Sequence, residues 1–226
     1  YSISGGADAA KFAIDAATGV LTFVAAPDFE TPTDAGANNV YDVQVTASTA
    51  SSGTAVQSLA VTVTAVNDND PVITTATTAS FAENATGTVI DVNATDADLP
   101  AQTLTFSITG GADAAKFAIN ATTGVVTFVS SPNFESPTDV GADNVYDLTV
   151  TASDGTRTVN QAIAVTVTAV NEFSPVFTSA ATANFAENGT GTVVTVQATD
   201  ADLPTATLTY SISGGVDAAK FAIDSA

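Results

Sequence analysis

Apolar and polar residues alternate with a period of two along much of the chain. From Tyr146 to Ala152 and from Ile163 to Ala169, every second residue is apolar. Successive side chains of a strand point to opposite faces, so this alternation predicts half-buried β-strands. Shorter stretches of the same kind predict strands within residues 89–94, 104–108 and 125–128.

Turn-forming residues separate these stretches, and no window carries a sustained apolar stripe of helical period. About seven short strands in about 100 residues predict an all-β fold, a Greek-key sandwich with one short helical turn near residues 112–116. The aromatic residues expected in its core are Phe12, Phe23, Phe81, Phe117, Phe128 and Tyr146.

The chain repeats itself with a period of about 104 residues. Residues 1–15 (YSISGGADAAKFAID) return at 106–120 and again at 210–224 with few changes. A period of this length matches one ordinary domain and is too long for a helical solenoid unit. We therefore predict the C-terminal portion of one repeat at 1–70, a complete repeat at 71–174, and the N-terminal portion of a third at 175–226.

The amino-acid composition excludes most kinds of enzyme active site. The 226 residues include no His, Cys, Met or Trp, and 4 basic residues face 24 acidic ones, for a formal net charge of −20. Triads, thiol nucleophiles, zinc and haem sites need His or Cys. Phosphate backbones and anionic membrane surfaces need Lys and Arg, so nucleic acid is not expected. Direct membrane insertion is not expected either, because no apolar stretch approaches the roughly 20 residues of a transmembrane helix. Oxygen ligands remain, and these suit hard cations such as Ca²⁺.

Several acidic motifs occur in a fixed order that resembles the cadherin-like tandem repeat, and the resemblance covers the whole chain. The motifs are Glu83-Asn84, Asp96-Ala97-Asp98, residues 117–125 (FAINATTGV), residues 132–135 (PNFE), residues 146–154 (YDLTVTASD) and the linker at 67–71 (NDNDP). The resemblance implies tandem seven-stranded, Ig-like sandwiches joined by calcium-binding linkers.

It also implies which residues hold calcium. At the first junction these are Asp28, Glu30, Asn67, Asp68, Asn69, Asp96, Asp98 and Asp154. At the second junction they are Glu83, Asn133, Glu135, Asn171, Glu172, Asp200 and Asp202. Glu187 would belong to a further junction.

The second junction departs from the first at two of these positions. Asn133 stands where the other copy has Asp28, and Phe173 stands where the other has Asn69. An amide oxygen keeps the geometry but removes a charge, so we expect weaker or fewer ions there. A physical argument also favours a cation: two carboxylates 4 Å apart repel by about 4 kcal/mol at an effective dielectric of about 20.

Other polar residues receive plainer interpretations. Asp8, Asp113 and Asp217 are expected to cap the short helical turn. Arg157 is expected to be an isolated surface charge. Four Asn-x-Thr sequons occur, but a Thr-rich chain produces such sequences by chance; they begin at Asn84, Asn93, Asn120 and Asn188.

Neither partial repeat can close a sandwich alone. One interpretation is that the chain is a window of a longer tandem array. The other is that residues 175–226 of one molecule complete residues 1–70 of the next, head to tail.

We therefore expect a structural, extracellular module: a calcium-rigidified extender or fibre subunit of a cell-surface adhesin or matrix filament, of the microbial giant adhesin type. Its expected partners are neighbouring repeats of the same chain or like subunits. The alternative is an adhesive module that binds a carbohydrate or a like domain, although the lack of Trp weakens the carbohydrate version. An enzyme is not expected, because a two-carboxylate glycosidase needs its acidic pair in a cleft.

Overall fold

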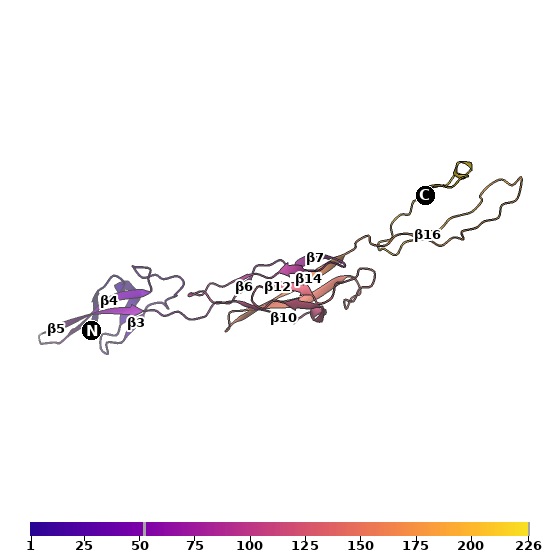
Figure 1. Cartoon of the computed structure of the whole chain (residues 1–226). Helices are drawn as coiled ribbons and strands as arrows, with labels where there is room; N and C mark the ends of the chain where they lie inside the picture. The colour runs from indigo at the N-terminus through magenta and orange to yellow at the C-terminus, as the bar shows by residue number, and fades with distance from the viewer. Residues whose placement is uncertain (52, 226) are drawn as a thin grey trace. The chain divides into compact units, whose positions relative to one another are not determined.

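The computed structural model describes residues 1–51 and 53–225 and confirms an all-β fold with short 3-10 turns (Figure 1). Ser52 and Ala226, which belong to the first and third expected repeats, lie outside the described residues. The chain forms two compact units. The first comprises 1–74, 93–105 and 151–160, and the second comprises 75–92, 106–150 and 161–226. None of the helical segments described is long and apolar enough to cross a membrane.

The first unit contains the strands within residues 1–70, called the N-terminal repeat below. They form a sheet of order β1-β4-β5 and a separate β2-β3 pair, and the unit also holds the short β6-β9 pair. The bounds are β1 Ser2–Gly5, β2 Phe12–Ile14, β3 Leu21–Phe23, β4 Val40–Ser48, β5 Thr54–Thr62, β6 Val72–Ile73 and β9 Ala94–Thr95.

Residues 71–174, called the central repeat below, contain two sheets, of order β10-β13-β14-β7 and β11-β12-β8. Thr105 of β10, residues 151–153 of β13 and residues 158–160 of β14 belong to the first unit, and the rest of these strands belongs to the second unit. Its last part contains the β15-β16 pair. The bounds are β7 Thr78–Ala82, β8 Thr88–Asp91, β10 Thr105–Gly110, β11 Phe117–Ile119, β12 Val125–Phe128, β13 Val145–Ser153, β14 Thr158–Thr168, β15 Val176–Phe177 and β16 Ala198–Thr199.

These strands confirm the predicted alternation and differ from it at one place. The expected strand at 89–94 is divided between β8 and β9. The division follows from pairing, because the Val92 N–H donates to the Gly124 carbonyl at 3.0 Å and Asn93 accepts from Thr74 N–H at 2.8 Å. Strand β8 therefore pairs with β12, whereas β9 pairs with β6.

The core of the central repeat lies on the inward positions of β13 and β14. Leu148, Val150 and Val165 are at most 1% exposed. Tyr146 packs edge-on against Phe128, with ring centroids 5.2 Å apart. Such tilted and edge contacts are the favoured geometry of aromatic pairs. Phe12, Phe81, Phe117 and Tyr146 are buried, as the sequence predicts, whereas Phe23 and Phe128 are half-buried and pack against Phe12 and Tyr146 respectively.

The capping role expected of Asp8, Asp113 and Asp217 is wrong, since none of these side chains caps its 3-10 turn. The carboxylate of Asp113 accepts hydrogen bonds from Val140 N–H at 2.8 Å and Asp147 N–H at 2.9 Å. Within the turn the Lys116 N–H already donates to the Asp113 backbone carbonyl at 2.8 Å, whereas strand β13 and the loop before it present N–H donors to the side chain. Asp113 therefore ties that loop to β13.

A second buried carboxylate shapes the same loop. Asp139 accepts from Asp143 N–H at 3.0 Å and Asn144 N–H at 3.2 Å, and Asn144 adopts a left-handed backbone with φ of 64°. Burial tends to raise the pKa of Asp139, but these donors outweigh burial and hold its pKa below the usual 3.8. The ionised form is thus the one that the fold uses.

This carboxylate predicts a dependence of stability on acid. Because the folded pKa is lowered, the contribution of Asp139 is present above about pH 4 and is lost as the pH falls through the lowered value. We expect Asp139→Asn to be less stable than wild type at pH 7 and to lose less stability on acidification, as measured by urea unfolding at several pH values. Equal acid dependence in Asp139→Asn and in the exposed Asp147→Asn would contradict this.

The core predicts a second effect on unfolding. Leu148→Ala removes buried methyl groups and leaves a cavity, so we expect a loss of about 2–5 kcal/mol in the unfolding of the central repeat. Val140→Ala, at a position 74% exposed, is the control and should change stability by less than about 0.5 kcal/mol. Denaturant midpoints of both variants measure the difference. Similar losses of stability in the two variants would contradict the placement of Leu148 in the core.

Candidate metal centres at two junctions

The first linker is fixed by the carboxylate of Asp98, which is 1% exposed. It accepts from Asn69 N–H at 3.2 Å, from the Asn69 side-chain amide at 2.8 Å and from Asp68 N–H at 3.3 Å. The Asn69 side chain contributes most to lowering the pKa of Asp98, against the opposing effect of burial. Asp98 is therefore held as an anion beside the linker.

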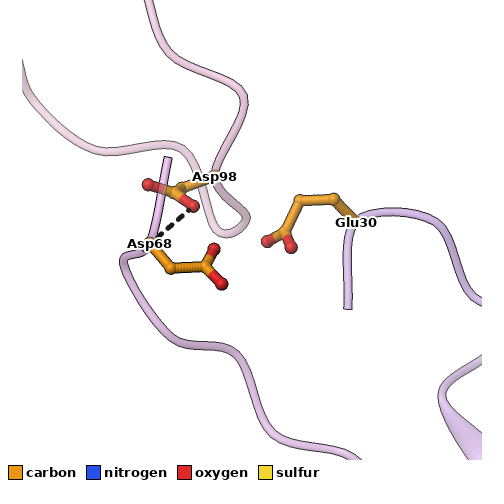
Figure 2. Close-up of side chains that lie close together, drawn as sticks. All are labelled: Glu30, Asp68 and Asp98. Carbon is orange, nitrogen blue, oxygen red and sulfur yellow. Dashed lines mark hydrogen bonds between the residues drawn. The ribbon is translucent and has the colours of Figure 1, made fainter. Parts of the chain in front are cut away.

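Four further acidic side chains surround this anion, and together we call them the first junction cluster. Carboxylate oxygens of Glu30, Asp68 and Asp98 lie within 4.8 Å of one another, and so do those of Asp96, Asp98 and Asp154. Figure 2 shows the Glu30 and Asp68 carboxylates turned toward the space beside Asp98. Residues far apart in sequence thus bring their charges to one place.

Hydrogen bonds position these carboxylates while leaving some of their oxygens free. Glu30 Oε1 accepts from Leu99 N–H at 3.1 Å, and Asp154 Oδ1 accepts from Thr156 N–H at 2.6 Å. Asp96 Oδ2, Asp154 Oδ2 and Asn67 Oδ1 are buried oxygens without a hydrogen-bond partner. Buried polar atoms are nearly always satisfied, so these three oxygens mark where an ion or an ordered water would bind.

The second junction is organised around Glu83, which is 2% exposed. Its two oxygens accept from Phe134 N–H and Val170 N–H, each at 2.7 Å. Burial tends to raise the pKa of Glu83, but these two donors lead the interactions that hold its pKa below the usual value. One carboxylate therefore joins the end of β7, the loop after β12 and the segment after β14.

Glu83, Glu135 and Glu172 form the second junction cluster, with oxygens within 4.8 Å of one another. Glu135 Oε1 accepts from Leu203 N–H at 3.1 Å, while its buried Oε2 has no partner. Burial and then the charges of Glu83 and Glu135 raise the pKa of Glu172, although the Asn84 side-chain amide donates to it. The ionised form of Glu172 is thus disfavoured at this position.

Asp202 repeats at the second linker the role of Asp98. It is 4% exposed and accepts from Glu172 N–H at 3.1 Å and Phe173 N–H at 3.2 Å. The replacement of Asn69 by Phe173 therefore keeps the backbone donor and loses only the side-chain amide.

The structure places the other predicted residues less centrally. Asp28 Oδ1 accepts from Glu30 N–H at 2.9 Å, and Asn133 Oδ1 accepts from Ser136 N–H at 2.8 Å, so each closes its own turn. Asp200 accepts from Asp202 N–H at 3.0 Å. Asn171 and Glu187 are exposed. Among the described acidic residues, Asp28, Asp200 and Glu187 are not in the carboxylate clusters.

Two contacts at the first linker were not expected from the sequence. Arg157, interpreted as an isolated charge, forms an ion pair with Asp70 at 2.9 Å, so that interpretation is wrong. Its position three residues after Asp154 could have indicated a place at the junction. Gln102 accepts from the Asn67 side-chain amide at 2.6 Å, and no motif pointed to it.

The donor sets of both clusters fit a hard cation. Every grouped side chain offers oxygen, and the ligands come from separate loops, which suits the flexible coordination of Ca²⁺ by six to eight oxygens. Softer metals prefer sulfur or imidazole, which this chain lacks. The unpartnered oxygens of Asp96, Asp154 and Glu135 supply lone pairs where an ion would need them.

Comparison with known proteins places this geometry in a family context. A family model described as "Cadherin domain" matches residues 77–170. The chain is 37% identical over 179 residues to human Cadherin EGF LAG seven-pass G-type receptor 2, covering 76% of the chain and 6% of the receptor. It is 40% identical over 76 residues to Halomucin of Haloquadratum walsbyi, covering 33% of the chain and 1% of that protein. These relatives are therefore far longer than the segment that they share with this chain.

Solved structures agree on the fold. The crystal structure of mouse Protocadherin-24 EC1-3 matches with a TM-score of 0.65 and 24% identity, covering 94% of this chain and 70% of that one. Human CDH23 EC21-23 matches with a TM-score of 0.60 and 22% identity, covering 85% and 62%. At this level of identity the likeness supports the sandwich fold alone.

The raised pKa of Glu172 predicts opposite effects with and without a cation. A carboxyl whose folded pKa is raised costs stability once the pH exceeds its usual value, and the cost is full above the raised value. In chelator at pH 7, Glu172→Gln should therefore raise the thermal midpoint of the second unit. In millimolar calcium the same change should reduce the stabilisation that calcium gives. Asp147→Asn removes an exposed charge outside the clusters and is the matched control; a Glu172→Gln profile identical to that of the control would overturn the prediction.

Proposed function

We propose that this chain, which is built from cadherin-like repeats, is a structural adhesion module whose junctions are made rigid by Ca²⁺. In this proposal the first junction cluster and the second junction cluster each bind calcium. The chain then serves as an extender or fibre segment of an extracellular adhesin or matrix filament.

The observation that carries the proposal is the set of buried, unpartnered oxygens beside an anchored anion. At the first junction, Asp96 and Asp154 each use one oxygen to accept backbone N–H groups and leave the other without a partner. Asp98, held as an anion, has a carboxylate oxygen within 4.8 Å of an oxygen of each. A divalent cation would satisfy these oxygens and neutralise the repulsion among the carboxylates.

The same arrangement explains how an ion would stiffen a linker. Glu30 comes from a loop of the N-terminal repeat, Asp68 from the linker, and Asp98 from the loop after β9. An ion shared by the three joins segments that otherwise have only a few hydrogen bonds between them. Without it, like charges within 4.8 Å repel one another and favour opening of the linker.

Localisation and partners follow from the affinity expected for such sites. Extracellular calcium modules bind at about 10⁻⁴ to 10⁻³ M, so they fill outside the cell and empty in the cytosol. Several matched proteins carry names of cadherin receptors, and one solved structure is described as a protocadherin cis-dimer. We infer an extracellular or cell-surface module without catalytic activity, whose partners are like repeats.

Calorimetric titration with calcium tests the proposal. We expect binding at about 10⁻⁴ to 10⁻³ M, with Asp98→Asn weakening the first junction and Glu83→Gln weakening the second by about tenfold or more. Asp147→Asn removes the same charge from an exposed strand position and should bind like wild type.

Two results would contradict it. One is the absence of calcium binding by the folded wild-type chain at millimolar concentrations. The other is equal weakening by all three substitutions, because a general charge effect would then replace a built site.

A further inference from the structure

The central repeat carries a cleft of about 430 Å³ beside its 3-10 turn. It is lined by the end of the turn at Lys116, by the loop after β12 at residues 128–133, and by Ser136, Thr138 and Tyr146. All of these residues belong to the second unit. The volume lies within the range of about 300–1,000 Å³ that is typical of small-ligand sites.

Hydrogen bonds hold the lining of this cleft in place. Val129 N–H donates to the Lys116 carbonyl at 2.8 Å, which ties the loop to the turn. Ser136 N–H donates to Asn133 Oδ1 at 2.8 Å, which fixes the bend that follows the loop. A cleft that is formed in advance loses less of the binding free energy to ordering when a ligand enters.

Among the described residues that line the cleft, Lys116 is the only charged one. It is half-buried, and its ammonium group forms no ion pair with any described residue, although the chain has 24 acidic residues. Asp113, three residues earlier, does not neutralise it, because the Asp113 carboxylate accepts from Val140 N–H and Asp147 N–H. The cleft therefore offers a positive charge to an anionic ligand.

Three uncharged polar groups at the cleft have no hydrogen-bond partner among the described residues. They are the hydroxyl groups of Ser130 and Ser136 and the side-chain N–H₂ of Asn133. Hydroxyl groups both donate and accept, and the amide nitrogen donates. Val129, which is 64% exposed, adds an apolar surface beside them. A sugar ring matches this lining, because it presents hydroxyl groups around an apolar face.

The N-terminal repeat has the same lysine at this place, Lys11, but different residues around it. Relative to that copy, the central repeat has gained two hydroxyl groups and lost one carboxylate. Both differences favour a ligand that is anionic and rich in hydroxyl groups. The residues concerned are Ser130, Ser131 and Asn133, which stand where the first copy has Ala25, Ala26 and Asp28.

We propose that this cleft binds one acidic sugar unit, a uronate. The Lys116 ammonium group binds the carboxylate through charge-assisted hydrogen bonds, and Ser130, Ser136 and the Asn133 amide bind the sugar hydroxyl groups. An acidic peptide would use the lysine and leave these polar groups without partners, so the lining favours a sugar. The site uses none of the grouped carboxylates and does not rest on calcium binding.

The net charge of the chain sets the conditions for a test. A protein with a formal net charge of −20 repels an anion at low ionic strength. At physiological ionic strength the Debye length is about 8 Å, so a ligand in the cleft is influenced mainly by nearby charges. Titrations are therefore carried out at that ionic strength, in chelator and again in millimolar calcium.

Three small ligands separate the two features of the site. Glucuronate has both a carboxylate and hydroxyl groups, glucose lacks the carboxylate, and cyclohexanecarboxylate lacks the hydroxyl groups. With about 13 non-hydrogen atoms, glucuronate is expected to bind at about 1 mM and to shift the amide NMR signals of Lys116 and Ser130 but not that of Lys11. The other two ligands should bind at least tenfold more weakly.

Equal binding of glucuronate and cyclohexanecarboxylate would overturn the assignment to a sugar, and equal binding of glucuronate and glucose would overturn the role of Lys116. A glutamate-rich peptide that binds more tightly than glucuronate would assign the cleft to an acidic protein segment instead. No shift of the cleft signals at tens of millimolar glucuronate would overturn the site itself.

The two matching lysines provide a controlled pair of variants. Lys116→Gln should weaken glucuronate binding about tenfold, because it removes the charge-assisted hydrogen bonds. Lys11→Gln removes the same charge from the N-terminal repeat and should bind glucuronate like wild type. Both should bind calcium like wild type, which separates this site from the junction clusters. Equal glucuronate affinities of the two variants would contradict the proposal.

Two further variants carry residues that the first copy already has at the same positions, so their folding is not in question, and thermal midpoints check it. Ser130→Ala should weaken glucuronate binding by severalfold, because one hydroxyl partner is lost. Asn133→Asp should weaken it about tenfold while leaving the weak binding of glucose unchanged, because it adds a negative charge to the cleft. Wild-type affinity for glucuronate in both variants would overturn the assigned lining.

Discussion

The interaction on which both junctions depend is a buried carboxylate that accepts hydrogen bonds from the backbone N–H groups of a linker. Asp98 does this at the first linker and Asp202 at the second. Backbone donors do not depend on side-chain identity, so the arrangement survives the change from Asn69 to Phe173. It fixes where the linker runs, and hence where the carboxylates of Asp68 and Glu172 lie.

This anchoring has an electrostatic consequence. Hydrogen-bond donors lower the pKa of Asp98 and Glu83 and so keep both carboxylates ionised. The other carboxylates of each cluster therefore lie beside a negative charge. Burial first, and then the charges of Glu83 and Glu135, raise the pKa of Glu172. Both clusters gather carboxylates without a basic side chain among their grouped residues, and Arg157 forms an ion pair with Asp70 at the first linker.

Much of the fold could be predicted from the sequence, because strand alternation and a period of about 104 residues are local and recurrent signals. The grouping of Glu30 with Asp98 needed the family resemblance, since their proximity depends on tertiary contacts. The roles of Asp113 and Gln102 could not be predicted. A side chain adjoining a turn reads as its cap, whereas Asp113 bonds to donors 27 and 34 residues away. Gln102 meets Asn67 only after both loops fold.

The central claim is that calcium bound at the two clusters restrains the linkers. Small-angle X-ray scattering of the same chain in millimolar calcium and in chelator tests it most directly. The account predicts a narrower distribution of interatomic distances in calcium, with a broader distribution in chelator that returns to the first when calcium is restored. Identical scattering in the two conditions, from protein shown to be folded in both, would contradict it.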